Sequence, residues 1–193
     1  MSMNDSDIEK TIKTLLSQVG ENPLREGLLE TPKRVAKMYR ELLSGYSKNP
    51  KDVFKVFENN GHEGMVTVIN DFYSLCEHHM LPFFGKVYIG YVPNGKILGL
   101  SKFTRLIDIF ACRLQTQECL TGQIAESIYK NLSPQGCIVH VEARHLCMSM
   151  RGVKREGITK TTVIDGIFNE KEELINQFYR DTGLSQVNNI NFK

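Results

Sequence analysis

The chain has 193 residues, of which 41% are hydrophobic and 24% charged, and a formal net charge of +2. This length fits one domain, or one domain with a helical arm, and it is sufficient to bury a hydrophobic core. The small net charge argues against a general nucleic-acid binder, which would carry a concentrated basic surface, so functional cations should form a local pocket.

The first third of the chain is predicted to be mostly helical. Apolar residues at helical spacing predict a helix over residues 5–19. A second helix is expected to start at Thr31, whose hydroxyl can cap it ahead of a proline, and to stop at Gly45. Residues 46–64 have the composition of a loop with one short helix. We therefore expect an N-terminal helical region over residues 1–64.

From Met65 onward the pattern is that of strands separated by helices. Strands are predicted at residues 65–75, 86–92, 97–100, 136–143 and 158–168. The segment 97–100 is expected to return along 86–92 after a PNGK turn. Helices are predicted from a capping Ser101, over about 116–131 and near 170–180. This order favours an antiparallel α+β domain over residues 65–193 and not a doubly wound sheet.

The sequence also bears on the cellular compartment. MSMNDSDIEK has no basic stretch followed by an apolar run, so no signal peptide is predicted. No stretch approaches the roughly 18 apolar residues of a membrane span. The five cysteines form an odd count without close regular pairs, which suits a reducing cytoplasm. We expect a cytoplasmic protein, with Cys112, Cys119 and Cys137 as small buried hydrophobes.

Two short segments combine thiols with imidazoles. In CEHH, Cys76 and His79 are three residues apart, a spacing that lets a turn direct both at one point. In RHLC, His145 and Cys147 are two apart, and in an extended segment both would face the same side. Cys76, His79 and Cys147 would make a catalytic zinc set with a fourth position for water, leaving His78 for proton transfer. Core thiols or a structural site are the alternatives.

Cations gather at predicted helix starts. LSKFTR places Lys102 and Arg105 in the first turn after Ser101, where positive charge is mildly unfavourable unless an anion binds the backbone amides. Arg34 in TPKR repeats this arrangement, and Arg151 follows the second thiol segment. These side chains could surround phosphate, or they could be solvated surface cations.

An amide and a carboxylate, Gln117 and Glu118, start the helix predicted over about 116–131. An acidic residue in a first turn complements the helix dipole, which is the ordinary explanation. The pair could equally hydrogen-bond a base edge that offers N–H donors, as guanine does.

Together these motifs resemble a known family. CEHH, LGLSKFTR, QTQECLTGQI and HLCMSMRG, in this order and spacing, are similar to zinc-dependent GTP cyclohydrolase I, and ETPKRVAKMY resembles its N-terminal helix motif. The likeness covers about residues 30–168 in separate blocks. Family members often have proline where this chain has Leu114, and arginine where it has Cys119. We expect these departures to affect the local helix start and a surface ion pair.

The resemblance implies a tunnelling fold, an antiparallel sheet with two helices on one face, assembled into a homodecamer of two pentamers with active sites at subunit interfaces. No nucleic-acid or membrane partner is implied. The implied zinc ligands are Cys76, His79 and Cys147, and the implied catalytic residues are His78, His145 and Ser101. The implied guanine contacts are Gln117 and Glu118. The implied ribose and triphosphate contacts are Ser101, Lys102, Arg105, Arg34 and Arg151. Leu100 is a further implied substrate contact.

The resemblance further implies hydrolytic opening of the GTP imidazole ring to 7,8-dihydroneopterin triphosphate and formate, the first step of pterin and tetrahydrofolate synthesis. As a hypothesis, zinc lowers the pKa of its water to about neutrality so that hydroxide attacks C8. His78 or His145 would protonate N7, and Ser101 would act as a relay while the ribose rearranges. Two rivals stay open: a non-catalytic zinc module for nucleic-acid or protein binding, and a related tunnelling-fold enzyme acting on another pterin or deazapurine.

Overall fold

A five-stranded sheet forms the centre of the structure, a computed structural model that describes residues 4–184. Its strand order is β5-β2-β3-β6-β7; the β5–β2 pairing is parallel and the other pairings are antiparallel. The strands are β2 (Val66–Cys76), β3 (Pro82–Val92), β5 (Leu114–Gln115), β6 (Gly136–His145) and β7 (Thr159–Gly166).

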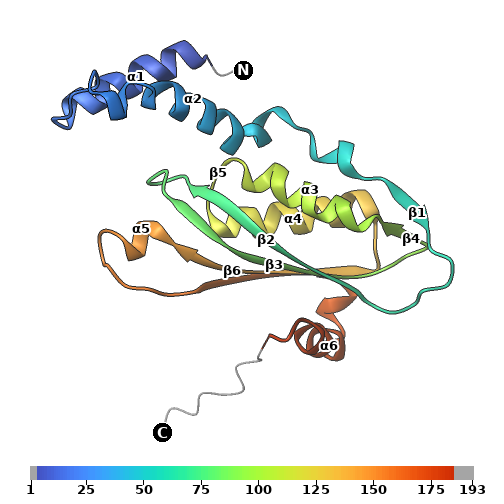
Figure 1. Cartoon of the computed structure of the whole chain (residues 1–193). Helices are drawn as coiled ribbons and strands as arrows, with labels where there is room; N and C mark the ends of the chain where they lie inside the picture. Colours follow the sequence, from blue (N-terminus) through green and yellow to red (C-terminus); the bar gives the residue numbers. More distant parts are fainter. Residues whose placement is uncertain (1–3, 185–193) are drawn as a thin grey trace, which may run out of the picture.

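Helices cover both faces of this sheet unequally (Figure 1). Two long helices lie on one face and a shorter one on the other, while α5 is a single turn directly after β6. These elements are α3 (Leu100–Ala111), α4 (Gln117–Leu132), α6 (Glu172–Thr182) and α5 (Leu146–Ser149). The predicted α+β class is confirmed, because two helices on one face of an antiparallel sheet are the arrangement of the tunnelling fold.

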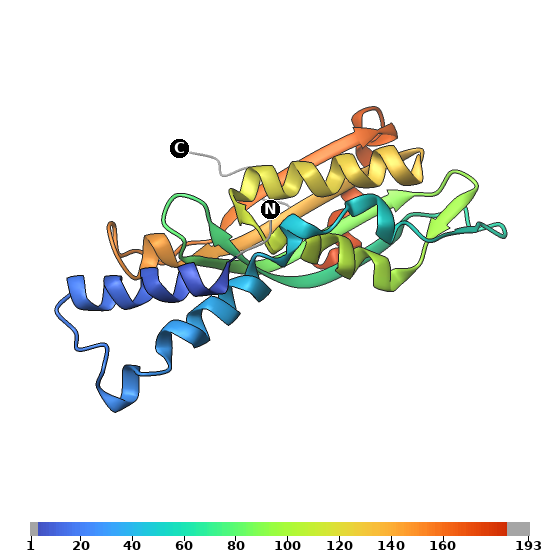
Figure 2. The ribbon, with the colours of Figure 1, turned by 90° about the horizontal axis from the view of Figure 1, so that it is seen from above.

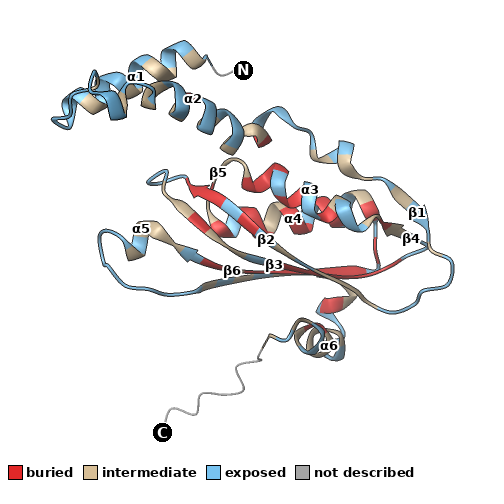
Figure 3. Ribbon diagram, viewed as in Figure 1, coloured by how far each residue is buried: buried red, intermediate tan, exposed pale blue. Residues whose placement is uncertain are grey.

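The main hydrophobic core lies between the sheet and the α3–α4 layer (Figure 3). The predicted apolar stripe of α3 is buried throughout: Phe103, Leu106, Ile107, Phe110 and Ala111. On α4, Leu120, Ile124 and Ile128 are buried, whereas Tyr129, also predicted on that stripe, is 37% exposed. Alternate residues of a strand share a face, so the burial of Val141 in this core places His145 on the same side of β6.

A second, smaller apolar cluster lies on the opposite face of the sheet. Tyr88 and Ile138 of the sheet pack there with Phe178 of α6. The predicted helix near residues 170–180 is therefore confirmed, and it shields part of a face that the two long helices leave open (Figure 1).

The N-terminal helices form an arm outside this body (Figures 1 and 2). Both predicted helices are confirmed, as α1 (Asp5–Gln18) and α2 (Thr31–Leu42), and they pack against one another. No residue of α1 is buried; Leu15 within it and Val19, its C-cap residue, are 54% and 66% exposed. The arm therefore presents apolar surface to its surroundings. Short 3-10 turns occupy Glu26–Leu28, Ser44–Ser47, Pro50–Val53 and Ile167–Asn169.

The strand predicted at residues 97–100 has a different partner from the one expected. It is observed as β4 (Lys96–Leu98) and pairs with β1 (Val56–Glu58) in a separate two-stranded sheet. The predicted return along β3 is wrong because β2 and β6 already occupy both edges of β3. Because β1 comes from the predicted N-terminal region, the two regions share a sheet, and their division after residue 64 stays a prediction. Residues 185–193 of the predicted second region lie outside the described residues.

Two predicted helix caps are also wrong. Glu30 and Gly99 are the N-cap residues of α2 and α3, and neither makes a side-chain capping bond. Thr31 and Ser101 already lie inside these helices, because each first turn begins earlier than predicted; the Gly99 carbonyl accepts a hydrogen bond from the Lys102 N–H at 2.8 Å.

The cysteines outside the thiol–imidazole segments differ in burial. Cys137 is buried, and burial raises its pKa to about 12, while Cys112 is half-buried. Cys119 is exposed, so its predicted burial is wrong; it lies beside the buried stripe of α4, which begins at Leu120. Among the described residues, no helix has both the length and the apolar character needed to cross a membrane.

Gly85 marks a close approach of β3 to β6. A Cβ added there would lie 1.9 Å from the Glu142 carbonyl oxygen. We expect Gly85→Ala to lower the free energy of unfolding by about 3 kcal/mol, because the two strands must separate locally to accept a methyl group. The midpoint of urea unfolding, followed by circular dichroism, measures the effect.

Gly122→Ala is the matched control. Gly122 lies within α4, and an added Cβ would meet nothing within 4 Å. Alanine is a better helix former than glycine, so this change should stabilise the protein by about 0.5–1 kcal/mol. A Gly85→Ala midpoint equal to that of the unmodified protein would contradict the close approach.

Candidate metal and catalytic site

Three predicted metal ligands meet at one end of the sheet. One ligand atom from each of Cys76, His79 and Cys147 can be chosen so that all three lie within 4.8 Å of one another. Cys76 is the last residue of β2, and Cys147 lies in α5 just after β6. β3 pairs with both β2 and β6, and its first residues lie opposite the last residues of both, with Phe83 opposite His145. The C-terminal ends of β2 and β6 therefore lie at the same end of the sheet. The sheet thus assembles the predicted group from distant parts of the sequence.

A tight turn after β2 directs Cys76 and His79 together. The Met80 N–H donates to the Cys76 carbonyl at 2.7 Å, and the Cys76 N–H donates to the Leu81 carbonyl at 2.9 Å. Met80 adopts a left-handed conformation, with φ of 54°. The turn therefore closes within a few residues, which is what the three-residue spacing predicted.

Cys147 reaches the group by a different local geometry from the one predicted. We expected His145 and Cys147 to lie in one extended segment. The structure instead ends β6 at His145 and turns into α5, so the two residues belong to different elements. The extended geometry is wrong, although Cys147 joins the group as predicted.

The donor chemistry of this group fits a soft divalent cation. Two thiols and one imidazole are the protein ligands of one type of catalytic zinc site. Burial raises the pKa of the Cys147 thiol, and the nearby Cys76 thiol raises it further. A bound divalent cation would favour the thiolates and so offset both effects. Within residues 4–184, no other His, Cys, Asp or Glu joins this group.

Arg151 brings a positive charge to the edge of the metal group. Its Nη1 lies 3.0 Å from Nε2 of His79. A guanidinium only donates hydrogen bonds, so this imidazole nitrogen must accept. If His79 binds a metal through the same nitrogen, the exposed guanidinium has to move away, and it would then be available to another anion.

Both predicted acid–base histidines lie in the short segments that carry the metal group, His78 between Cys76 and His79 and His145 two residues before Cys147. His78 is exposed, and its Nδ1 lies 3.8 Å from Sγ of Cys76. His145 is half-buried and stacks on Phe83, with ring centroids 4.8 Å apart and 5° between the planes. Burial lowers the pKa of His145, and the charge of Glu118 opposes this shift. The local environment therefore favours a neutral His145 ring at neutral pH.

The predicted base-binding pair consists of one buried and one exposed residue. Gln117 is 1% exposed, and its Oε1 lies 2.9 Å from Nε2 of His145. Glu118 is exposed in the first turn of α4, close enough to His145 to influence its pKa. The side chain of Glu118 can therefore meet a ligand beside the metal group, whereas the Gln117 amide faces its own subunit.

The predicted phosphate contacts on α3 lie at the other end of the subunit. The helix begins beside β4, whereas its last turn is followed by β5, which pairs with the end of β2 (Figure 1). A helical rise of about 1.5 Å per residue puts Ser101 about 15 Å from Ala111. One subunit therefore does not bring Leu100, Ser101, Lys102 and Arg105 to the metal group. Arg34 is exposed in the first turn of α2, in the arm.

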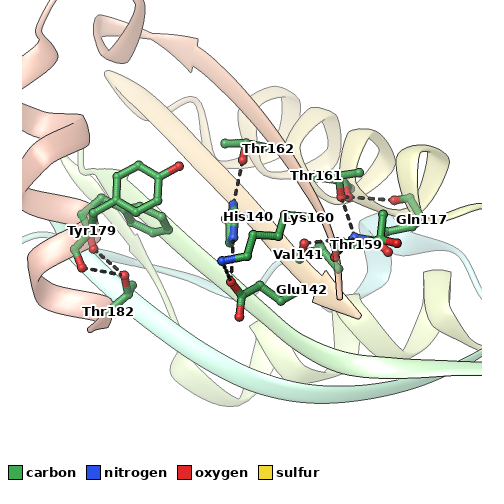
Figure 4. Close-up of polar contacts among 12 residues, drawn as sticks. Gln117, His140, Val141, Glu142, Thr159, Lys160, Thr161, Thr162, Tyr179 and Thr182 are labelled. Atoms are coloured by element: carbon green, nitrogen blue, oxygen red, sulfur yellow. Dashed lines mark hydrogen bonds and ion pairs between the residues drawn. The ribbon is translucent and has the colours of Figure 1, made fainter. Parts of the chain in front are cut away.

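Two features of β6 and its neighbouring strands were not predicted. The first is the stacking of Phe83 on His145, which depends on the pairing of β3 with β6. The second is a polar cluster on the opposite face of the sheet, where His140 Nδ1 lies 2.7 Å from the Thr162 hydroxyl (Figure 4). Alternation along β6 was the available signal, because His140 and His145 differ by an odd number of residues and so face opposite sides.

A family model and several curated relatives that are similar to this chain share one name. The family model described as GTP cyclohydrolase I matches residues 8–183. A GTP cyclohydrolase 1 from Streptococcus gordonii is 50% identical over 186 residues, covering 91% of this chain and 100% of that protein. The Brucella abortus strain S19 protein of the same name is 51% identical over 172 residues, covering 87% and 81%. The Bartonella bacilliformis one is 50% identical over 170 residues, covering 86% and 82%. This chain belongs to the GTP cyclohydrolase I family.

Proposed function

We propose that this protein opens the imidazole ring of GTP by hydrolysis and releases 7,8-dihydroneopterin triphosphate and formate. The observation that carries the proposal is the group formed by Cys76, His79 and Cys147, with His145 two residues before Cys147, in a member of this family. Loss of C8 as formate requires water activation and proton transfer at the base, and these are the chemistries that thiolate-held metal and imidazole side chains supply.

The metal we propose is zinc, held by Cys76, His79 and Cys147. Soft thiolate ligands favour zinc over magnesium or calcium, which prefer oxygen ligands. When bound, zinc supplies Lewis-acid activation of water for the hydrolytic steps.

The other residues near this group have separable proposed roles. His145, neutral and half-buried, and the exposed His78 would move protons to and from the purine nitrogens. Glu118 would accept hydrogen bonds from N1–H and the exocyclic amine of guanine, which adenine cannot offer in the same pattern. Arg151 would hold phosphate, and because the phosphates are remote from C8 its contribution would be positioning.

The remaining predicted substrate contacts are proposed to come from another copy of the chain. The start of α3 is distant from the metal group within one subunit, so one subunit alone does not supply both (Figure 1). Leu15 of α1 and Val19, its C-cap residue, are exposed and offer apolar surface for association. We propose the homodecamer of two pentamers that the family resemblance implies. In it, Leu100, Ser101 as a relay, Lys102, Arg105 and Arg34 would complete a neighbour's site.

A reducing cytoplasmic location is proposed with this activity. The metal group uses two reduced thiols, and all five cysteines of the described chain are free. The product would enter pterin and tetrahydrofolate synthesis.

Incubation with GTP tests the activity directly. Formate and a pterin that becomes fluorescent after oxidation should appear in equal amounts. Absence of both products from metal-loaded protein would overturn the proposal. Turnover of another purine or pterin in place of GTP would favour the related tunnelling-fold enzyme.

Cys147→Ser should remove metal and turnover together. Serine is a poor ligand for zinc, so the bound metal measured by elemental analysis should fall to a small fraction and kcat should fall at least about a hundredfold. Cys119→Ser is the control, because Cys119 is exposed and outside the metal group, and it should keep both metal and turnover. Full turnover by metal-free Cys147→Ser would exclude this site from the reaction.

Mixed assemblies test whether two copies share a site. Cys147→Ser and the double variant Lys102→Ala/Arg105→Ala should each be nearly inactive alone. In an equal mixture that is unfolded and refolded together, about a quarter of the sites would combine an intact metal end with an intact α3 start, so about a quarter of the activity should return. Mass spectrometry of tagged subunits verifies that the copies mix. Verified mixing without recovered activity would mean that one chain supplies the whole site.

A further inference from the structure

Gln117 lies at the junction of α4 with two strands of the sheet. It is the first residue of α4 after the N-cap Thr116, and its side chain is almost fully buried against β6 and β7. A buried amide costs free energy unless its donors and acceptor are paired. The hydrogen-bond partners of this amide therefore indicate the role of the Gln117 side chain.

The amide nitrogen of Gln117 faces the sheet. Nε2 lies 3.0 Å from the carbonyl oxygens of Val141 and Thr159 and 3.2 Å from the Thr161 hydroxyl (Figure 4). Carbonyl oxygens only accept hydrogen bonds, so the NH2 group must point at them. The flipped amide would place its oxygen against two carbonyl oxygens. The orientation of the Gln117 amide is thereby determined by its surroundings.

The neighbouring hydroxyls agree with this orientation. The Thr121 hydroxyl donates to the Gln117 backbone carbonyl at 2.7 Å, so it must accept in its 2.6 Å contact with the Thr161 hydroxyl. Thr161 therefore donates to Thr121, and its oxygen, the most distant of the three acceptors around Nε2, can only share one of the two amide hydrogens with a carbonyl oxygen. The hydroxyl contacts thus agree with an amide whose two hydrogens are directed at the carbonyl oxygens of Val141 and Thr159, which hold the Gln117 side chain in place.

The same orientation determines where the hydrogen of His145 lies. Oε1 of Gln117 only accepts, and it lies 2.9 Å from Nε2 of His145. Nε2 must therefore carry a hydrogen. In the neutral ring the lone pair is then on Nδ1, and the stacked Phe83 ring holds the imidazole plane.

We propose that Gln117 is a positioning residue that holds His145 as its Nε2–H tautomer, so that Nδ1 is the nitrogen that exchanges protons with the substrate. This rests on the proposed function, in which His145 moves protons. It also replaces the contact with guanine that we predicted for Gln117, because both ends of its amide are engaged within the subunit. The exposed Glu118 is left as the base contact.

Steady-state kinetics separate positioning from base binding. Gln117→Met keeps the approximate volume but removes the acceptor that faces His145. A positioning role predicts that kcat falls at least about tenfold while KM for GTP stays within about twofold. The metal content should stay unchanged. A base contact predicts the opposite pattern, a higher KM with kcat retained, and that result would overturn the proposal.

Thr161→Val is the matched control. It removes one hydrogen-bond partner of Nε2 but leaves Oε1 of Gln117 opposite His145. Its thermal midpoint should fall because the hydrogen bond between the Thr161 and Thr121 hydroxyls is lost. The Val141 and Thr159 carbonyl oxygens still hold the Gln117 amide, so kcat should stay within about threefold of the unmodified enzyme. If Thr161→Val loses as much kcat as Gln117→Met, general loosening of α4 explains both, and positioning is rejected.

The tautomer can be measured without substrate. Solid-state NMR of zinc-loaded protein labelled with 15N in its five histidines, at about pH 8, reports which ring nitrogen is protonated. The His145 signals are assigned by their loss in His145→Ala. We expect an Nε2–H ring in the unmodified protein and a mixture of tautomers in Gln117→Met.

An Nδ1–H ring in the unmodified protein would overturn the proposal even if Gln117→Met does not fold. Because this measurement needs no GTP, it also separates the two proposals. A protein with the expected tautomer but no formate release would retain the role of Gln117 in holding the ring and reject the proposed reaction.

Discussion

The antiparallel pairing of β3 with both β2 and β6 is the constraint on which the site depends. It places the end of β2, with Cys76, beside the end of β6, with His145. A slip of one residue in either pairing would move every side chain of that strand to the other face. A slip in the pairing of β3 with β6 would also move Val139 and Val141 of β6 out of the main core, in which they are buried. The same hydrophobic burial that stabilises the sheet therefore determines where the metal ligands and His145 lie.

The start of α4 is a second anchor, and it couples stability to chemistry. Gln117 buries a polar amide between the helix and the sheet, at a cost that its hydrogen bonds to Val141 and Thr159 offset. The oxygen of that amide then faces His145. Residues that attach α4 to the sheet thus also determine the environment of the His145 imidazole. The packing of α4 on the sheet therefore keeps this part of the site rigid.

The sequence predicted the features that depend on local spacing and missed those that depend on distant neighbours. The buried stripe of α3 and the convergence of Cys76 with His79 follow from helical and turn periodicity, and both are confirmed. The partner of β4 was missed because strand pairing depends on which edges other strands have already occupied. Gln117 and Glu118 are neighbours with similar chemistry, yet only packing against β7 buries the first and leaves the second exposed.

The division of the predicted site between the two ends of the subunit has a consequence for the whole assembly. If the metal end of one copy works only with the α3 start of another, turnover requires association, and dilution that separates the copies removes activity without unfolding them. In a closed symmetric ring every copy gives one end and receives the other, so all sites are completed together. Leu15 of α1 and Val19, its C-cap residue, are exposed apolar residues that such an assembly could cover. The apolar surface that the single chain exposes would, on this view, contribute to the assembly that completes each site.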